Sequence, residues 1–459
     1  MRTSRRIAVI DIGKTNAKLA LVDLDTLTEI AVVTRPNTVL PGPPWPHFDT
    51  EGHWAFLLDA LSAFHRDHGV DAISVTTHGA SIALLDRAGG LAAPILDYEH
   101  PIPAEIAESY DAIRPDFAQT GSPRLAGGLN VGAQLHYQFS QDARLRDRTH
   151  AIVGYPQYWG ARLTGEVACD VTSIGCHTDL WAPNAGTFSD LVDRLGIADK
   201  MAPVRLPRDV LGVILPEIAM ATGLPKDTPV AVGIHDSNAS LYPHILGQSA
   251  PLSVVSTGTW VIAMALGGRR VNLDPARDTL VNVNAFGDPV PSARFMGGRE
   301  FEVIAGGQQT TPTELDITDV LEAGLMILPA VEPTTGPFQG RAMSWSAKEP
   351  PLGTGQRAAA LSFYLAMMTD TCLRLVSGDG PTIVEGPFAH NAAFKNMLAS
   401  ATGRPVQHSA ATTGTAIGAA LLFSDDATRL RPMSGAVEEG RAMWADYAAR
   451  WRERVGSSA

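Results

Sequence analysis

Residues 7–25 read IAVIDIGKTNAKLALVDLD, a stretch that predicts two apolar strands joined by a tight polar turn. The apolar run Ile7–Ile10 is typical of a buried strand, Gly13 interrupts the pattern, and a second apolar run follows. The same design returns at residues 252–268, which read LSVVSTGTWVIAMALGG, and a shift of 245 positions places Gly13 on Gly258. A repeated strand–turn–strand unit indicates that the chain has two related halves.

Each half also contains a later segment of small residues that opens a helix. Residues 233–245 read GIHDSNASLYPHI, and residues 411–423 read ATTGTAIGAALLF. Before the first of these segments, strand-like runs alternate with helix-like runs such as residues 54–68, which indicates an α/β domain of about 240 residues. We therefore predict an α/β protein of two related domains that face each other, at residues 1–244 and 245–459.

The composition narrows the class of protein. Of 459 residues, 45% are hydrophobic and 18% charged, which fits a globular chain with a large core. The formal net charge is −12, opposite in sign to that of a dedicated nucleic-acid binder. The three cysteines show no CxxC motif, so neither a disulfide framework nor a zinc site is indicated. No apolar run is long enough for a signal-peptide core or a membrane span, so we expect a cytoplasmic protein without nucleic-acid or membrane partners.

The turn of the first hairpin carries residues suited to a metal–polyphosphate site. Asp11 stands near the end of the first strand, and Gly13, Thr15, Asn16 and Lys18 come after it. Backbone N–H groups and a threonine hydroxyl can cradle phosphate oxygens, while an aspartate holds a hydrated Mg²⁺. A plain hairpin with polar turn residues explains most of the same pattern, so the hairpin alone leaves both interpretations open.

A P-loop is excluded, although residues 13–15 spell GKT. The P-loop motif needs another glycine five residues before the glycine of its GK pair, and that position is Ala8, inside the predicted strand. The second hairpin reads STGTW at residues 256–260, so its glycine also lies among hydroxyl side chains. Two matched hairpins suit two clamps on one polyphosphate, with Gly258 and Thr259 in the second clamp.

Asp236 is the candidate for the central chemical step. It ends the strand-like stretch 229–236, whose apolar part runs from Val230 to Ile234, and it precedes Ser237 and Asn238. One interpretation is therefore a helix N-cap. The other is a general base at the carboxyl end of a strand, where ligands of α/β proteins bind. Such a base would accept the proton of a substrate hydroxyl as its oxygen attacks a phosphorus atom.

Two further segments carry side chains suited to ligands. His78 and Gly79 end a strand, and residues 97–100 read DYEH, a group of donors and acceptors of the kind that polyol recognition needs. In the segment EGPFAHN, Gly386 permits close approach of a flat ligand such as adenine, with Asn391 nearby. The alternatives are structural loop residues in the first case and a helix-start turn capped by Asn391 in the second.

In their order along the chain, these segments resemble the motifs of the FGGY family of carbohydrate kinases, within the actin/Hsp70/hexokinase-like ATPase superfamily. DIGKTNAK is similar to the first phosphate motif, VGIHDSNAS to the segment with the catalytic aspartate, and VVSTGTW to the second phosphate motif. IVEGPFAHN is similar to the adenosine motif, and TTGTAIGAALL to the closing helix. The resemblance implies two ribonuclease-H-like domains around a central cleft, which close on substrate.

Carried over residue by residue, the resemblance implies a set of site residues. Asp236 would be the catalytic base, and Asp11 would organise Mg²⁺ with Asp236 beside it. ATP and phosphate contacts would come from Gly13, Thr15, Asn16, Lys18, Gly258, Thr259, Gly386 and Asn391. The sugar would lie in the first domain, against His78, Gly79, Tyr98, Glu99 and His235.

The resemblance implies ATP- and Mg²⁺-dependent phosphorylation of a small-molecule sugar, and family analogy adds a homodimer. STGTW and the His235–Asp236 pair favour a ketose of the L-rhamnulose, L-fuculose or xylulose class. Where many relatives have Trp-x-Asp-x-Arg, this chain has residues 97–100, with Glu99 for the aspartate and no arginine. The alternatives are a kinase for glycerol or another polyol, a phosphotransferase for acetate or N-acetylated sugars, and a non-catalytic nucleotide-dependent binding module. A binding module would have no use for a base at Asp236.

The small residues of the two matched helices suggest close packing at a hinge. They are Ala239 and Ser240 in the first helix, and Ala416, Gly418, Ala419 and Ala420 in the second.

Overall fold

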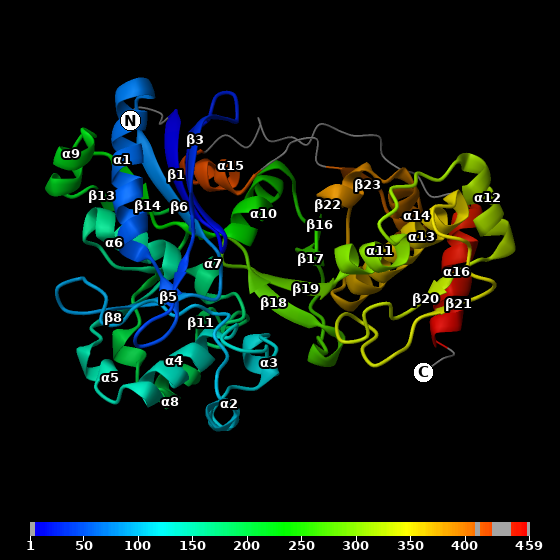
Figure 1. The fold of residues 1–459 in the computed structure, drawn as a ribbon, viewed down its shortest axis with the longest axis horizontal. Coiled ribbons are helices and arrows are strands. Elements are labelled where there is room, and N and C mark those ends of the chain that lie inside the picture. Colours follow the sequence, from blue (N-terminus) through cyan, green and yellow to red (C-terminus); the bar gives the residue numbers. More distant parts are fainter. Residues whose placement is uncertain (1–4, 409–413, 425–441, 457–459) are drawn as a thin grey trace. The chain divides into compact units, whose positions relative to one another are not determined.

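The computed structural model describes residues 5–408, 414–424 and 442–456. It divides into two compact units, which Figure 1 shows in sequence colours. The first unit comprises residues 1–246, 281–289 and 413–430, and the second comprises residues 247–280, 290–412 and 431–459. Of the small-residue segment 411–423, the first three residues lie outside the described residues.

The first unit is built on a mixed sheet with the strand order β13-β14-β6-β1-β2-β3, and β15 pairs with β6. β1 is antiparallel to β2 and parallel to β6. The strand bounds are Arg6–Ile12 (β1), Asn16–Asp23 (β2), Thr28–Pro36 (β3), Ala72–Thr77 (β6), Val210–Val213 (β13), Pro229–Ala231 (β14) and Ile234–His235 (β15).

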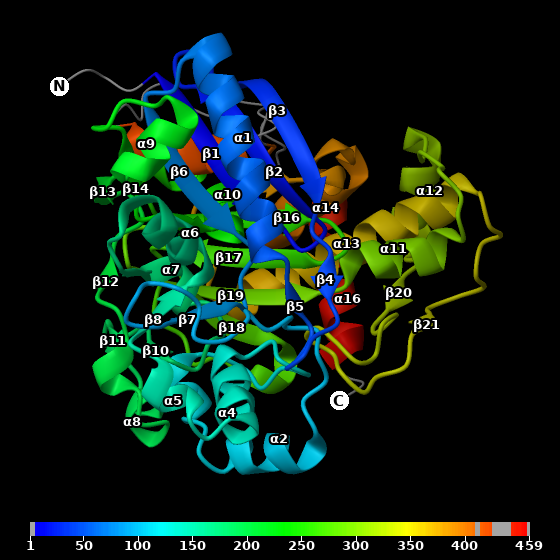
Figure 2. The same cartoon turned by 60° about the vertical axis from the view of Figure 1, so that its left-hand side comes forward.

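Both faces of β1 are buried, which explains why its sequence is apolar at successive positions. Ala8 and Ile10 pack in one core cluster with Leu57 and Leu61 of α1 (Thr50–His68). Their neighbours in the strand point the other way, into a cluster with α10 (Asp236–Gly247) and α15 (Thr415–Ala420). Figure 2 shows α1 lying along one face of this sheet. The packing on both faces therefore fixes β1 near its carboxyl end, where Asp11 lies.

The remaining helices of the first unit follow the sheet strands and their connections. They are α2 (Ala104–Asp111), α3 (Phe117–Thr120), α4 (Val131–Gln141), α5 (Leu145–Arg148), α6 (Tyr155–Thr164), α7 (Val171–Ile174), α8 (Leu191–Arg194) and α9 (Pro216–Thr222). Short strand pairs are β4 (Val39–Leu40) with β5 (His47–Phe48), β7 (Ile82–Leu85) with β8 (Ala151–Gly154), β9 (Cys169–Asp170) with β12 (Val204–Arg205), and β10 (Trp181–Ala182) with β11 (Thr187–Phe188).

The second unit has its own mixed sheet, in the order β18-β19-β17-β16-β22-β23. Its strands are β16 (Leu252–Thr257), β17 (Val261–Leu266), β18 (Thr279–Val283), β19 (Pro289–Phe295), β22 (Thr382–Glu385) and β23 (Val406–His408). Its helices are α11 (Gly297–Ala305), α12 (Glu314–Ala323), α13 (Gly355–Leu375), α14 (Ala392–Thr402) and α16 (Ala442–Gly456), and a small pair joins β20 (Ile327–Leu328) to β21 (Ser344–Trp345).

The two sheets repeat one design, which confirms the predicted α/β architecture of two ribonuclease-H-like halves. β16 is antiparallel to β17 and parallel to β22, as β1 is to β2 and β6. The hairpin turns differ by one residue, because Ile12 pairs with Ala17 whereas Thr257 pairs with Val261. The shift of 245 positions therefore aligns the first strands, and the second strands align one position closer.

Two details differ from the sequence-based expectation. The helix expected at residues 54–68 begins at Thr50, because the Asp49 side chain accepts a hydrogen bond from Gly52 N and caps it earlier. The strand expected over 229–236 is broken into β14 and β15 at Gly233, whose φ is 97°.

All three cysteines are buried and free. Among the described residues, no helix is both long and apolar enough to cross a membrane.

Candidate active site

Two hydrogen bonds from Asn37 hold the turn between β1 and β2. Asn37 donates its backbone N–H to Thr15 O at 2.9 Å and its side-chain amide to Gly13 O at 2.8 Å. His53 Nε2 contacts Asn37 Oδ1 at 2.8 Å and holds the amide in place. The carbonyls of Gly13 and Thr15 thus accept hydrogen bonds, while the N–H groups of Lys14 and Thr15 donate to no described residue. This geometry suits a phosphate oxygen at the turn.

Asp11 lies on β1 directly opposite Lys18 on β2. Burial raises the pKa of Asp11 to about 6, and the nearby charges of Asp236 and Glu29 add to the rise, while Lys18 opposes it. Lys18 Nζ in turn bonds Glu29 Oε1 at 2.7 Å, so its charge is shared with a second carboxylate. The predicted phosphate lysine is therefore already paired in the absence of ligand. Asn16, also predicted at the phosphate, hydrogen-bonds the Thr15 hydroxyl at 3.2 Å.

Asp236 is the first residue of α10, directly after β15. Its Oδ1 accepts hydrogen bonds from Ser237 N at 2.6 Å and Ser237 Oγ at 3.2 Å, and lies 3.1 Å from His235 Nε2. Its Oδ2 makes no hydrogen bond to any described residue. Burial raises the pKa of Asp236, but the charge and hydrogen bond of His235 outweigh it and hold this pKa below its ordinary value. The carboxylate is ionised at neutral pH, with one oxygen available to accept a proton.

His235 is buried beside the carboxylate that it contacts, and one neighbour holds its backbone while another leaves room for its ring. The backbone N–H of His235 donates to Thr172 Oγ1 at 3.0 Å. A Cβ on Gly79 would lie 2.7 Å from His235 Nε2, so only glycine leaves room for the ring there. Gly79, predicted to contact sugar, is thus placed by the structure as a steric partner of His235.

Cys176 and His177 lie beside His235, and neither was predicted as a site residue. Burial alone raises the pKa of the Cys176 thiol, but the charges of His177 and His235 bring it down to about 5. Burial lowers the pKa of His235, yet Cys176 and Asp236 hold it well above its ordinary value. His235 Nε2 faces Asp236 Oδ1 at 3.1 Å, whereas its buried Nδ1 has no hydrogen-bond partner.

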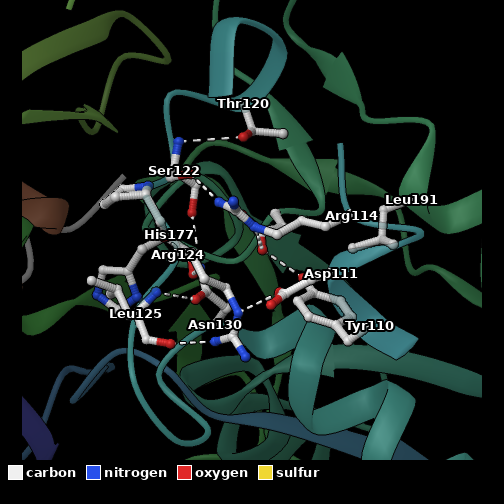
Figure 3. A network of polar contacts seen from close by, with 12 residues as sticks. Tyr110, Asp111, Arg114, Thr120, Ser122, Arg124, Leu125, Asn130, His177 and Leu191 are labelled. Atoms are coloured by element: carbon white, nitrogen blue, oxygen red, sulfur yellow. Dashed lines mark hydrogen bonds and ion pairs between the residues drawn. The ribbon is translucent and has the colours of Figure 1, made fainter. Parts of the chain in front are cut away.

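The segment around His177 is fixed by the polar network in Figure 3. Asn130 Nδ2 donates to His177 O at 3.3 Å and to Ser122 Oγ at 3.2 Å. Arg114 Nε donates to Asp179 Oδ2 at 2.8 Å, with 3.1 Å from Nη2 to Oδ1. His177 and Asp179 take left-handed backbone conformations, with φ of 39° and 65°. The network stabilises this unfavourable backbone conformation and thereby fixes the position of His177, which lies beside His235.

His78 provides an unused acceptor in an aromatic setting. Its ring centroid lies 5.1 Å from that of Phe48, 5.2 Å from Tyr98 and 5.1 Å from Tyr155. His78 Nδ1 bonds Gly79 O at 2.9 Å, while the buried Nε2 has no hydrogen-bond partner. Burial lowers the pKa of His78, so the ring is neutral and its Nε2 can accept a hydroxyl proton.

The segment 97–100 meets the phosphate turn through a residue that the sequence-based prediction missed. Lys14 Nζ bonds Asp97 Oδ1 and lies 3.1 Å from Glu99 Oε2, and its ammonium sits 4.7 Å from the ring centroid of Tyr98. Burial and the Glu99 charge raise the pKa of Tyr98 to about 12, so its phenol stays protonated. Tyr98 and Glu99 are therefore gathered with His78 in the first unit.

In the second unit, the turn between β16 and β17 abuts the start of α11. Gly258 N donates to Trp260 O at 2.9 Å, and Gly298 N donates to Thr259 O at 3.2 Å. A Cβ on Gly298 would lie 2.3 Å from Gly258 O, so this approach requires glycine. Arg294 lies over the Trp260 ring, 4.7 Å from its centroid. The turn predicted as a second phosphate clamp is thus buttressed by a helix N-terminus.

Gly386 lies against the same turn. Its φ is 82°, and a Cβ there would lie 1.9 Å from Thr257 O. Thr257 Oγ1 also donates to Glu385 O at 2.6 Å, which ties the ends of β16 and β22 together. Asn391 instead caps α14, accepting from Phe394 N at 3.0 Å and donating to Ser362 Oγ at 2.9 Å. Both ends of its amide are committed within the unit, which realises the helix-cap alternative.

The described residues hold no group of three or more His, Cys, Asp or Glu side chains that could bind a metal ion by themselves. Burial is the main cause of the raised pKa of Asp11, and the charge of Asp236 adds to it, so these two carboxylates interact. A hydrated Mg²⁺ carried mainly by nucleotide phosphates fits such a pair, because Mg²⁺ in phosphate sites commonly uses only one or two carboxylates.

Comparison with known proteins shows which family domain each half of the chain matches. Residues 6–242 match the N-terminal domain of the FGGY family of carbohydrate kinases, and residues 249–432 match the family's C-terminal domain. The chain belongs to the FGGY family. The solved structure of a carbohydrate kinase from Novosphingobium aromaticivorans is 37% identical with a TM-score of 0.90, covering 99% of both chains.

Two further similar proteins have names that state a sugar substrate. The L-fuculokinase of Salmonella typhi is 26% identical over 270 residues, which is 57% of this chain and 57% of that protein. The alignment thus spans little more than half of that relative. The xylulose kinase of Rhodospirillum rubrum is 20% identical with a TM-score of 0.78, covering 99% of this chain and 98% of that one, a likeness that shows the fold alone.

Proposed function

We propose that this protein transfers the γ-phosphoryl group of ATP to a hydroxyl of a small neutral sugar. The observation that carries the proposal is Asp236, whose ionised carboxylate keeps one oxygen unbonded at the start of α10 while His235 holds the other. A chain that only bound nucleotide would gain nothing from this arrangement. Family membership supplies the reaction class, and the site supplies the residues.

In this proposal Asp236 acts as the general base. The substrate hydroxyl donates its proton to Asp236 Oδ2 as its oxygen forms a bond to the γ-phosphorus, and the bond from that phosphorus to the bridging oxygen of ADP breaks. His235 keeps the carboxylate oriented and ionised. Positioning and charge neutralisation then provide most of the acceleration, because phosphoryl transfer asks for little covalent help.

We assign the phosphates to the two hairpin turns. The free N–H groups at Lys14 and Thr15 would bind oxygens of the transferring phosphate, and the turn at Gly258 and Thr259 would bind the other side of the polyphosphate. Gly386, whose close contact with Thr257 O leaves no room for a Cβ, lies beside the second turn, where we place the adenine. Mg²⁺, held by the nucleotide near Asp11 and Asp236, would neutralise phosphate charge. In this proposal residues 1–244 bind the sugar and supply the catalytic base, and residues 245–459 bind the nucleotide.

We assign the sugar to the first unit, where His78, Tyr98 and Glu99 offer an acceptor, a donor and a carboxylate. The unpartnered Nε2 of His78 can accept a hydrogen bond from a sugar hydroxyl, and the aromatic rings can pack against the apolar face of a sugar. The L-fuculokinase relative, with STGTW and the His235–Asp236 pair, favours a ketose of the L-fuculose, L-rhamnulose or xylulose class. Glycerol or another polyol is the second candidate.

The test is ADP release with Mg²⁺–ATP against a panel of sugars. The panel includes L-fuculose, L-rhamnulose, both xyluloses, both ribuloses, erythrulose and glycerol. The proposal expects one compound to raise ADP release at least about 100-fold over the sugar-free rate, with the phosphorylated sugar recovered by mass spectrometry. ATP binding without stimulation by any sugar in the panel, or in a wider set of neutral polyols, would contradict it.

A further inference from the structure

Lys14 connects the phosphate turn to the segment 97–100, and nothing in the family comparison assigns it a role. It follows Gly13 in the turn, yet its side chain runs away from the turn to the DYEH segment. Its ammonium bonds Asp97 and lies 3.1 Å from Glu99 Oε2. It also lies 4.7 Å from the ring centroid of Tyr98 and 5.5 Å from that of Phe48. The contact joins positions 83 residues apart.

An ordinary surface ion pair does not describe this contact. The Asp97 side chain is 10% exposed and that of Lys14 is 22% exposed, whereas that of Glu99 is 63% exposed. A buried carboxylate is costly unless a cation compensates it, and among the described residues Lys14 is the only basic side chain paired with Asp97. The two aromatic rings add cation–π attraction and exclude water from one side of the ammonium. The Lys14–Asp97 ion pair is therefore a largely buried part of the first unit.

The backbone of the segment depends on the same carboxylate. Asp97 Oδ1 accepts Glu99 N at 3.2 Å, and Asp97 N donates to Pro46 O at 2.9 Å. Gly128 N donates to Tyr98 O at 3.2 Å on the other side. Asp97 thus faces inward to Lys14, and Glu99 is the exposed acid that remains for a ligand. Loss of the ammonium would leave Asp97 uncompensated and the direction of Glu99 undetermined.

We propose that Lys14 is a positioning residue for sugar recognition. Through Asp97 and Glu99 it holds the sugar-facing segment at a fixed place relative to the phosphate turn. One ammonium between two carboxylates leaves one net negative charge on these three side chains, which favours a neutral polyol over an aldonic acid or a sugar phosphate. This inference rests on the proposed kinase function and deepens it.

The test separates sugar binding from chemistry. Lys14→Met and Lys14→Gln are expected to raise the KM for the sugar about 10- to 100-fold, the range for loss of a hydrogen bond to a charged group. The KM for the sugar should change far more than kcat or the KM for ATP, because the substitutions remove only the Lys14 side chain and keep its N–H group in the turn. Lys14→Arg should recover most of the sugar KM, since a guanidinium can bond both carboxylates. Lys226→Met, at an exposed lysine outside the site, is the control for charge loss and should match the parent.

A double-mutant cycle with Asp97→Asn sharpens the result. If Lys14 acts through Asp97, the double variant Lys14→Met/Asp97→Asn should have a sugar KM close to that of either single variant rather than the product of the two effects. A purely structural role would instead lower the melting temperature and kcat together without selective change in the sugar KM. That outcome, or an unchanged sugar KM in both Lys14→Met and Lys14→Gln, overturns the inference while leaving the kinase proposal intact. A parent protein that phosphorylates no polyol overturns both.

Discussion

The unbonded Oδ2 of Asp236 is the residue-scale feature on which the proposed chemistry depends. Its partner oxygen is held by His235 and Ser237, so the carboxylate cannot rotate freely, and its pKa lies below the ordinary value. Asp236 is the first residue of α10, and its Oδ1 accepts a hydrogen bond from the N–H of the next residue, Ser237. Its Oδ2 bonds no described residue, which leaves this oxygen available for the base role that we propose.

Gly79 offers a sharp test of the support behind Asp236. In Gly79→Ala the new Cβ would lie 2.7 Å from His235 Nε2, so the ring must move away from Asp236. We expect kcat to fall by about 10-fold or more with little change in the KM for ATP, because orientation of the base is lost while the nucleotide contacts remain. Gly90→Ala is the control, since its nearest neighbour would be 3.5 Å away. Steady-state kinetics with equal activity in Gly79→Ala and parent would show that His235 does not orient the base.

Glu300 gives a prediction on stability in the second unit. It is 1% exposed, and burial raises its pKa to about 7. The folded state therefore binds this proton more tightly than the unfolded state, and stability falls as the pH rises from about 4.5 through 7. Glu300→Gln removes that cost and keeps the acceptor for Glu332 N. We expect urea unfolding at pH 8 to show a gain of roughly 1 to 3 kcal/mol, shrinking as the pH falls toward 4.5. Equal stability of the two proteins at pH 8 would contradict the raised pKa.

At the scale of elements, two hairpins and two helices carry the site. Much of this could be predicted from the sequence, because apolar runs around a glycine mark a hairpin and small residues mark a closely packed helix. The register could not, since the one-residue difference between the two turns depends on backbone pairing that the side-chain pattern does not encode. The same limit applies to Lys14, whose partner Asp97 is distant in sequence, and to Asn37, which looks like an ordinary loop residue.

The packing of α15 on α10 depends on a single glycine. A Cβ on Gly418 would lie 1.7 Å from Ala239 O, so the two helices of the first unit approach as closely as their backbones allow. We expect Gly418→Ala to destabilise the protein by about 1 to 3 kcal/mol through overpacking, measured as a lower denaturation midpoint. Gly414→Ala, where no atom lies within 4 Å of the new Cβ, should have a much smaller effect. A parent-like midpoint in Gly418→Ala would refute the close approach.

At the scale of the molecule, the sequence predicted two related α/β halves because the hairpin repeat recurs over a long interval. The compact units depart from a simple cut of the chain, since residues 281–289 and 413–430 group with the first unit. Segments that cross between units carry no signal in composition or periodicity, so the sequence alone could not place them. Both units contain the repeated hairpin as neighbouring antiparallel strands, β1–β2 and β16–β17.

A kinase of this kind must keep water from the transferring phosphate, so we expect sugar and nucleotide together to compact the molecule. Small-angle X-ray scattering should show a smaller radius of gyration with both sugar and a non-hydrolysable ATP analogue than with either alone. The sugar-free rate of ATP hydrolysis should also be low. An unchanged radius of gyration with both ligands bound would mean that catalysis proceeds without closure.

The most direct test of the central claim is the turnover of Asp236→Asn with the sugar identified from the panel. The account predicts that kcat falls at least about 1,000-fold while ATP affinity, measured by calorimetry, stays within about 3-fold of the parent, because the variant keeps the shape and loses the base. Asp227→Asn, an exposed aspartate outside the site, serves as the matched control and should turn over like the parent. Near-normal turnover in Asp236→Asn would contradict the assignment of the base and, with it, the proposed mechanism.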